Sequence, residues 1–309
     1  MKIEDLHKSF ITGRFAIWGT IIVFIALRLP GSGNGFTIPW GIALIVQLGI
    51  AFLLLQLIHS FAIIRYRSLL PAFFYLLFTG TDSFFFYDSI GSISSLLIVF
   101  CLFFLFDSYN NFQSQQNAFN IAVLLTVGSL IWAPMLLFFL LFWIGLAQFR
   151  SLGFRTFMAS LLGFAMVYLF LFTWSVYKDD WGIVLDYLNR YRALFEAQYW
   201  DIRSVHLIRP AEWIRGGFVV ILFLLSMWRI WVSGISEKVR VRTFLDYLFI
   251  FPLLIFVLVF FPNEGRREWI LISYIPVSLL IAHFFTFTLK DWASWLFLFT
   301  ILFFLVLHA

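Results

Sequence analysis

Long apolar blocks, separated by short polar segments, run along almost the whole chain. In a bilayer, each such block satisfies its own backbone hydrogen bonds by forming a helix. We therefore predict an all-α fold, a polytopic transmembrane helical bundle of about eleven spans, in a single integral membrane domain covering residues 1–309. The spans are expected at residues 15–29, 39–64, 69–80, 92–106, 118–133, 135–149, 157–177, 216–232, 244–261, 269–287 and 293–308.

Several of these predicted spans are short. A helix of 15 residues rises only ~22 Å, whereas the hydrocarbon core of a bilayer is ~30 Å thick. The segment 69–80 is therefore either a full span or a re-entrant half-helix. For 118–149 we expect a hairpin of two helices with its turn at Ala133 and Pro134, because one helix over this segment would measure ~48 Å.

The composition agrees with a bilayer environment and excludes a water-soluble fold. Hydrophobic residues make up 62% of the chain and charged residues 12%, against about 25% charged residues in soluble domains. The one cysteine, Cys101, cannot form a disulfide within the chain. The net charge of +5 is spread in ones and twos, which fits membrane orientation better than a nucleic-acid-binding patch. We expect the lipid bilayer, and no nucleic acid, as a partner.

The distribution of lysine and arginine predicts a cytoplasmic N-terminus. With alternating spans, most basic residues fall on the side of the N-terminus, among them Lys2, Arg65, Arg150 and Lys238. The positive-inside rule makes this side the cytoplasm. The segment 178–215 is the exception, since it carries several basic residues on the predicted outer side.

The segment 178–215 is the one sizeable polar insertion, and we expect it to be extracytoplasmic. Its first part predicts an amphipathic helix lying at the outer membrane surface, because its apolar residues recur at helical spacing along one face. These residues are Trp181, Val184, Leu185, Leu188, Tyr191 and Phe195.

Two acidic residues, Asp82 and Asp88, are candidate catalytic residues. They lie between a short span and the next long one, and a surface loop is the least costly place for them. There they could activate an acceptor hydroxyl or coordinate a divalent cation. The structural alternative is turn formation and helix capping by Asp88 or Ser89.

A second group of residues is a candidate site for a lipid phosphate, which guanidinium groups bind through paired hydrogen bonds. The structural alternatives are a solvated loop and a tight turn. The candidates are Arg203, His206, Arg209 and Arg215, in the second half of the insertion, and Arg266 and Arg267, in a charged turn near the end of the chain. His59 and His283 have no histidine or cysteine at ligand spacing, so we predict no metal site, and we identify no cofactor.

The stretch 117–171 carries a resemblance to known membrane proteins. It combines an Asn-rich turn and two short spans around Pro134 with a basic turn at Arg150 and Arg155. It resembles an uncharacterised family of polytopic inner-membrane proteins of Bacteroidota-type bacteria. More distantly, it is similar to the helical region of GT-C-type glycosyltransferases, which use polyprenyl-linked sugars. The resemblance implies a bacterial inner-membrane location.

The GT-C resemblance also implies an acidic residue in the first outer loop. Here that loop, residues 30–36, contains no acid. Asp82 or Asp88, in the second outer loop, would have to take that role, with a divalent cation as its possible cofactor.

Three functions fit these patterns. The leading hypothesis is a non-enzymatic accessory subunit of a cell-envelope assembly, which docks other membrane subunits through its outer segment. The alternatives are a GT-C-like transferase that uses a polyprenyl-phosphate-linked donor, and a transporter or lipid flippase. A transferase should have a polar cavity in which Asp82 or Asp88 faces arginines, whereas a subunit should have a flat apolar outer surface and no enclosed polar site.

Overall fold

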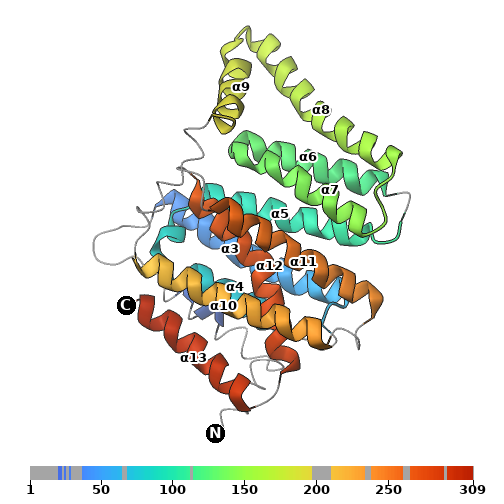
Figure 1. Cartoon of the computed structure of the whole chain (residues 1–309). Coiled ribbons are helices and arrows are strands. Elements are labelled where there is room, and N and C mark those ends of the chain that lie inside the picture. The colour runs from blue at the N-terminus through green and yellow to red at the C-terminus, as the bar shows by residue number, and fades with distance from the viewer. Residues whose placement is uncertain are drawn as a thin grey trace.

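The chain folds into an all-α assembly (Figure 1). The computed structural model describes residues 20–22, 24–25, 28, 37–64, 68–111, 114–196, 210–233, 238–259, 265–288 and 291–308. Every regular element in these residues is a helix. Most of the predicted first span, 15–29, lies outside the described residues.

Six of the described helices are long and apolar enough to cross a membrane, so the chain is a multi-pass membrane protein. The predicted all-α membrane fold is confirmed at this level, and the count of about eleven spans stays a prediction. The six are α3 (Ile38–Phe61), α5 (Ser89–Asp107), α8 (Phe154–Lys178), α10 (Pro210–Ser233), α11 (Val239–Val259) and α12 (Arg266–Phe287). The shorter helices are α4 (Leu70–Gly80), η1 (Ser83–Phe86), α6 (Gln115–Ile131), η2 (Ala133–Leu137), α7 (Phe138–Gln148), α9 (Gly182–Leu194) and α13 (Asp291–His308).

Two helices, α4 and α12, form the centre of the molecule (Figure 1). In α12, 89% of the apolar stretch is buried inside the protein, against 17% in α8. All of α4 is buried, and its neighbours are α3, α12 and α13. With 11 residues, α4 measures only about 16 Å, so it lies inside the bundle without crossing it alone.

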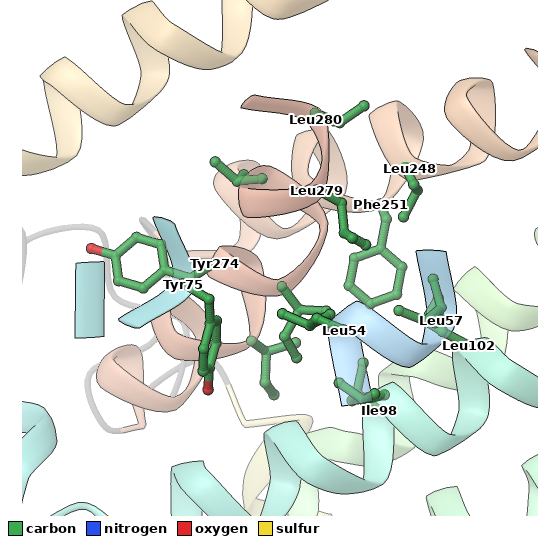
Figure 2. Close-up of a cluster of buried hydrophobic side chains, with 14 of the residues drawn as sticks. Leu54, Leu57, Tyr75, Ile98, Leu102, Leu248, Phe251, Tyr274, Leu279 and Leu280 are labelled. Atoms are coloured by element: carbon green, nitrogen blue, oxygen red, sulfur yellow. The ribbon is translucent and has the colours of Figure 1, made fainter. Parts of the chain in front are cut away.

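Aromatic and branched aliphatic side chains fill the space around this centre. Figure 2 shows side chains from α3, α4, α5, α11 and α12 meeting in one cluster. Close by, the rings of Phe106 and Phe244 stack with their centroids 4.6 Å apart. Such ring pairs contribute about 0.5–1.5 kcal/mol beyond the burial of their area. The 22% aromatic content is therefore used in part for packing between helices.

The predicted hairpin over 118–149 is confirmed. Helix α6 ends at Ile131, and η2 contains Pro134 and leads into α7, which returns beside α6 (Figure 1). At the other end of the hairpin, the N–H of Asn110 donates to the carbonyl of Phe149 across 2.9 Å. Helix α8 then packs against α6 at Gly163, where a Cβ would lie 2.7 Å from the carbonyl oxygen of Phe119.

The predicted amphipathic helix is present as α9, but its apolar face is divided. The hydroxyls of Tyr191 and Ser129 lie 3.0 Å apart, so one side of α9 packs on the end of α6. Most of the other apolar residues of the predicted stripe are exposed. The exposed ones are Trp181, Leu185, Leu188 and Phe195.

The boundary of the polar insertion differs from the expected one. We expected a short helix starting at Pro210 and a separate span from residue 216, but one helix, α10, covers Pro210–Ser233. The reason is that Glu212 and Arg215, which have the composition of a loop, lie on the first turns of a long helix. Their charges face other charges of the protein, and this allows them to occupy a helix end.

Candidate functional site

A pocket of about 260 Å³ lies at one end of the bundle, which we call the η1 end. The first turns of α10 and α12, the last turns of α11 and the turn after α4 enclose it. Most of its wall is apolar, and charged side chains contribute a small part of it. The charged ones are Asp82, Glu212, Arg215, Arg266 and Arg267, and the apolar ones include Phe85, Val219, Val220, Phe256, Val259 and Ile270.

Asp82 is buried, so the predicted position of this residue in a surface loop is wrong. We expected a surface loop, but Asp82 is only 8% exposed. Its Oδ2 lies 3.1 Å from Nη1 of Arg215. A buried charge is tolerated when it is paired, and the pairing explains why the carboxylate can lie beneath the surface. The structure thereby joins a residue from each of the two predicted sites.

Arg215 has a second contact, so that it connects two helices and one turn. Its Nη2 donates to the carbonyl of Leu307 across 2.6 Å, near the end of α13. The last carbonyls of a helix have no partner within the helix, so this contact satisfies one of them. Through these two contacts, Arg215 on α10 binds both α13 and the turn between α4 and η1.

Arg266 and Arg267 open helix α12 on the other side of the pocket. Gly265 precedes them with φ of 77°, a conformation that glycine adopts without steric cost. Nε of Arg266 donates to the carbonyl of Val259 across 3.1 Å, which fixes the end of α11 to the start of α12. The carboxylate of Glu212 interacts electrostatically with Arg266.

Asp88 has the structural role that we gave as the alternative. Its Oδ1 accepts a hydrogen bond of 2.7 Å from the N–H of Gly91 and caps α5. Burial raises the pKa of the Asp88 carboxyl, although the Gly91 hydrogen bond and the charges of Arg267 and Arg28 act in the opposite direction. Asp88 does not line the pocket.

Arg28 and Gln47 support the turn between α4 and α5, and sequence reasoning did not identify either. Both are fully buried. Arg28 donates from Nη2 to the carbonyl of Phe85, and Nε2 of Gln47 lies 3.3 Å from the same oxygen. The ring of Phe85 lines the pocket. A lone polar residue in an apolar stretch was the signal available in the sequence.

The remaining predicted residues are placed as follows. Arg203, His206 and Arg209 lie outside the described residues. Within the part of the chain that the structure describes, no group of three or more His, Cys, Asp or Glu side chains could hold a metal ion. The structure thus brings Asp82, Arg215, Arg266 and Arg267 to one pocket and leaves Asp88 beside it.

The pocket at the η1 end contains both guanidinium groups and apolar side chains. Guanidinium groups bind phosphate oxygens, and the apolar side chains around the pocket suit a hydrocarbon chain. The pocket lies at the ends of helices α10, α11 and α12. No family model, curated protein or solved structure matches the chain significantly.

Proposed function

We propose that this protein binds a phosphate-bearing membrane lipid in the pocket at the η1 end and acts as a non-enzymatic, lipid-binding subunit of a cell-envelope assembly. The observation that carries the proposal is the joint lining of the pocket by three arginines and several apolar side chains. A hydrocarbon chain fits the apolar wall, and the lipid phosphate fits the guanidinium groups.

Arg266 and Arg267 are the phosphate donors in this proposal, because both line the pocket. Arg215 contacts Asp82 and Leu307 and has a structural role. Arg266 and Arg267 lie in the first turn of α12, where the helix dipole also favours a negative charge.

Native mass spectrometry of the purified full-length chain in detergent tests this function. We expect wild-type protein to retain phospholipid adducts, and Arg267→Gln to lose most of them. Arg192→Gln is the matched control, because Arg192 is exposed on α9 and lies 3.8 Å from Glu196. Wild-type protein without lipid adducts, or an Arg267→Gln variant with unchanged adducts, would contradict the proposal.

The GT-C-like transferase is the second candidate, and one observation favours it. Asp82 lies in the pocket beside arginines, as a transferase would require of its general base. Its ion pair with Arg215 weighs against this role, because the carboxylate already has a partner within the protein. Release of polyprenyl phosphate from a polyprenyl-linked sugar by wild type, and its loss in Asp82→Asn, would establish the transferase.

The location of the protein is part of the same proposal. The basic residues support a cytoplasmic N-terminus, which puts the η1 end outside, and the resemblance of residues 117–171 supports a bacterial inner membrane. The exposed face of α9 supports a position of this helix in the headgroup region, since it presents Trp181, Leu185 and Leu188. Quenching of Trp181 fluorescence by lipids brominated near the headgroup tests that depth.

A further inference from the structure

We propose that a hydrocarbon chain of the bound lipid passes between the pocket at the η1 end and the bilayer through a side opening at Gly216 and Gly217 of α10. This inference rests on the proposed lipid-binding function. It places the chain directly against the backbone of α10 at these two glycines, while the phosphate stays at Arg266 and Arg267.

The first argument is the wall that α10 contributes to the pocket. Four of its lining residues recur at helical spacing, so they share one face of the helix. They are Trp213, Gly216, Gly217 and Val220. Trp213 and both glycines are also exposed. The pocket therefore reaches the surface of the protein at this face of α10.

The second argument is that packing within the protein does not require either glycine. A Cβ at Gly216 or Gly217 would meet no atom within 4 Å, whereas a Cβ at Gly163 would meet the backbone of α6. Each glycine in a helix interior costs up to about 1 kcal/mol relative to alanine. Close approach of a ligand to the backbone is a use of glycine that accounts for this cost at two adjacent positions.

The third argument is that the pocket is closed at its inner end. Along α10 it extends from Glu212 to Val220, a rise of about 12 Å. About one turn further along α10, the rings of Phe223 and Phe256 meet with their centroids 5.6 Å apart. This contact joins α10 to α11, so a chain longer than the pocket has to leave it sideways.

The fourth argument concerns what lies outside the opening. Helix α13 packs on a different face of α10, where the ring centroids of Phe218 and Phe303 lie 4.2 Å apart. Further along α10, the side chains of Ile221, Leu224 and Trp228 are exposed. Because α10 is long and apolar enough to cross a membrane, these side chains face hydrocarbon. The opening therefore leads from the pocket into the bilayer.

Lipid titration of glycine variants tests the inference. Delipidated full-length protein in detergent is titrated with phosphatidylglycerol and, separately, with phosphatidylethanolamine, and native mass spectrometry counts the adducts. Gly217→Leu should weaken binding about tenfold, which corresponds to about 1.4 kcal/mol, because its side chain fills the opening. Gly217→Ala should weaken binding about threefold, or by about 0.7 kcal/mol.

The stability of the same variants should change in the opposite direction. A Cβ at Gly217 has open space around it, and alanine and leucine are better helix formers than glycine. Both variants should therefore resist SDS-induced unfolding at least as well as wild-type protein. A loss of lipid without a loss of stability shows that the glycine serves the ligand and not the fold.

Gly49→Leu in α3 is the matched control. A Cβ at Gly49 also meets no atom within 4 Å, its neighbours Ile45 and Phe52 on α3 are exposed, and Gly49 does not line the pocket. This variant should bind both lipids as wild-type protein does. An equal loss of lipid in Gly49→Leu would contradict the inference.

The contrary outcomes separate the side opening from the proposed function. If Gly217→Leu binds lipid as tightly as wild-type protein while Arg267→Gln loses it, the side opening is wrong and lipid binding stands. Should Gly217→Leu fail to fold, wild-type affinity in Gly217→Ala is the result that refutes the opening. If wild-type protein binds neither lipid, both proposals are wrong.

Discussion

Arg215 on α10 forms an ion pair with Asp82 in the turn after α4, with 3.1 Å between Nη1 and Oδ2, and both side chains are largely buried. Breaking such a pair from one side leaves an uncompensated buried charge and costs about 3–5 kcal/mol, whereas replacing both charges often costs little. The two residues therefore stabilise the η1 end as a unit.

Removal of one charge of this pair should therefore lower the free energy of unfolding more than removal of both charges. We expect Asp82→Ala to lower the free energy of unfolding by about 3 kcal/mol or more, and the double variant Asp82→Ala/Arg215→Met to lose less than the sum of the single variants. Unfolding in mixed micelles with a rising share of SDS measures all three. Additive losses, within about 0.5 kcal/mol, would show that the two residues do not interact.

Close packing of α6 and α8 depends on Gly163. A Cβ there would lie 2.7 Å from the backbone oxygen of Phe119 and 3.0 Å from Cβ of Ala122. We expect Gly163→Ala to destabilise the protein by about 1–3 kcal/mol, because the two helices must move apart. The same unfolding assay applies.

The matched control for this change is Gly49→Ala in α3, where a Cβ would meet no atom within 4 Å. Alanine is the better helix former by up to about 1 kcal/mol, so this variant should be as stable as wild type or more stable. A Gly163→Ala variant as stable as Gly49→Ala would refute the close contact of α6 and α8.

The cap of α5 gives a prediction that depends on pH. Burial raises the pKa of Asp88, so the folded state holds the proton more tightly than the unfolded state does. The Asp88 side chain therefore favours folding most at low pH, and this contribution falls as the pH rises through the raised pKa. Asparagine keeps the acceptor for the Gly91 N–H without the charge.

We therefore expect Asp88→Asn to be at least as stable as wild type at neutral pH, with the difference shrinking as the pH falls below the pKa. Asp88→Ala should lose about 1 kcal/mol at neutral pH because the cap is gone. Thermal unfolding across a pH series compares the three proteins. An Asp88→Asn variant that loses as much as Asp88→Ala would mean that the charge, and not the hydrogen bond, stabilises α5.

The attachment of α9 to the bundle depends on Tyr191 and Ser129, whose hydroxyls lie 3.0 Å apart. Tyr191→Phe should remove a hydrogen bond worth about 1 kcal/mol and raise hydrogen exchange in residues 182–194. Tyr187→Phe in the same helix is the control, since Tyr187 is not part of this contact. Equal exchange in both variants would show that this hydrogen bond does not hold α9 in place.

The sequence predicted which segments are helical better than it predicted where each helix ends and which distant residues its side chains contact. The α6–α7 hairpin followed from length alone, because the segment is too long for one crossing and Pro134 interrupts it. Proline is common at a helix start, but hydropathy alone did not show that the charged segment at Pro210 is continuous with the following span. Glu212 and Arg215 have the composition of a loop, and the sequence does not show that Arg215 pairs with the distant Asp82.

The sequence identified most of the charged residues of the pocket one by one. It did not predict that they lie together in one site. Asp82, Arg215, Arg266 and Arg267 were each identified, and yet Asp82 was assigned to a different site from the arginines. Local patterns contain no information on which distant turns meet at one end of a bundle. Gln47 was missed because one amide inside an apolar helix gives no periodic signal.

The position of α4 has a consequence for how the protein is made. This short helix is surrounded by α3 from the first part of the chain and by α12 and α13 from the last. Its final surroundings are therefore incomplete until the C-terminal helices leave the ribosome. A chain truncated before α12 should therefore leave α4 without most of its packing partners, and α4 reaches its folded surroundings only after α12 and α13 are made.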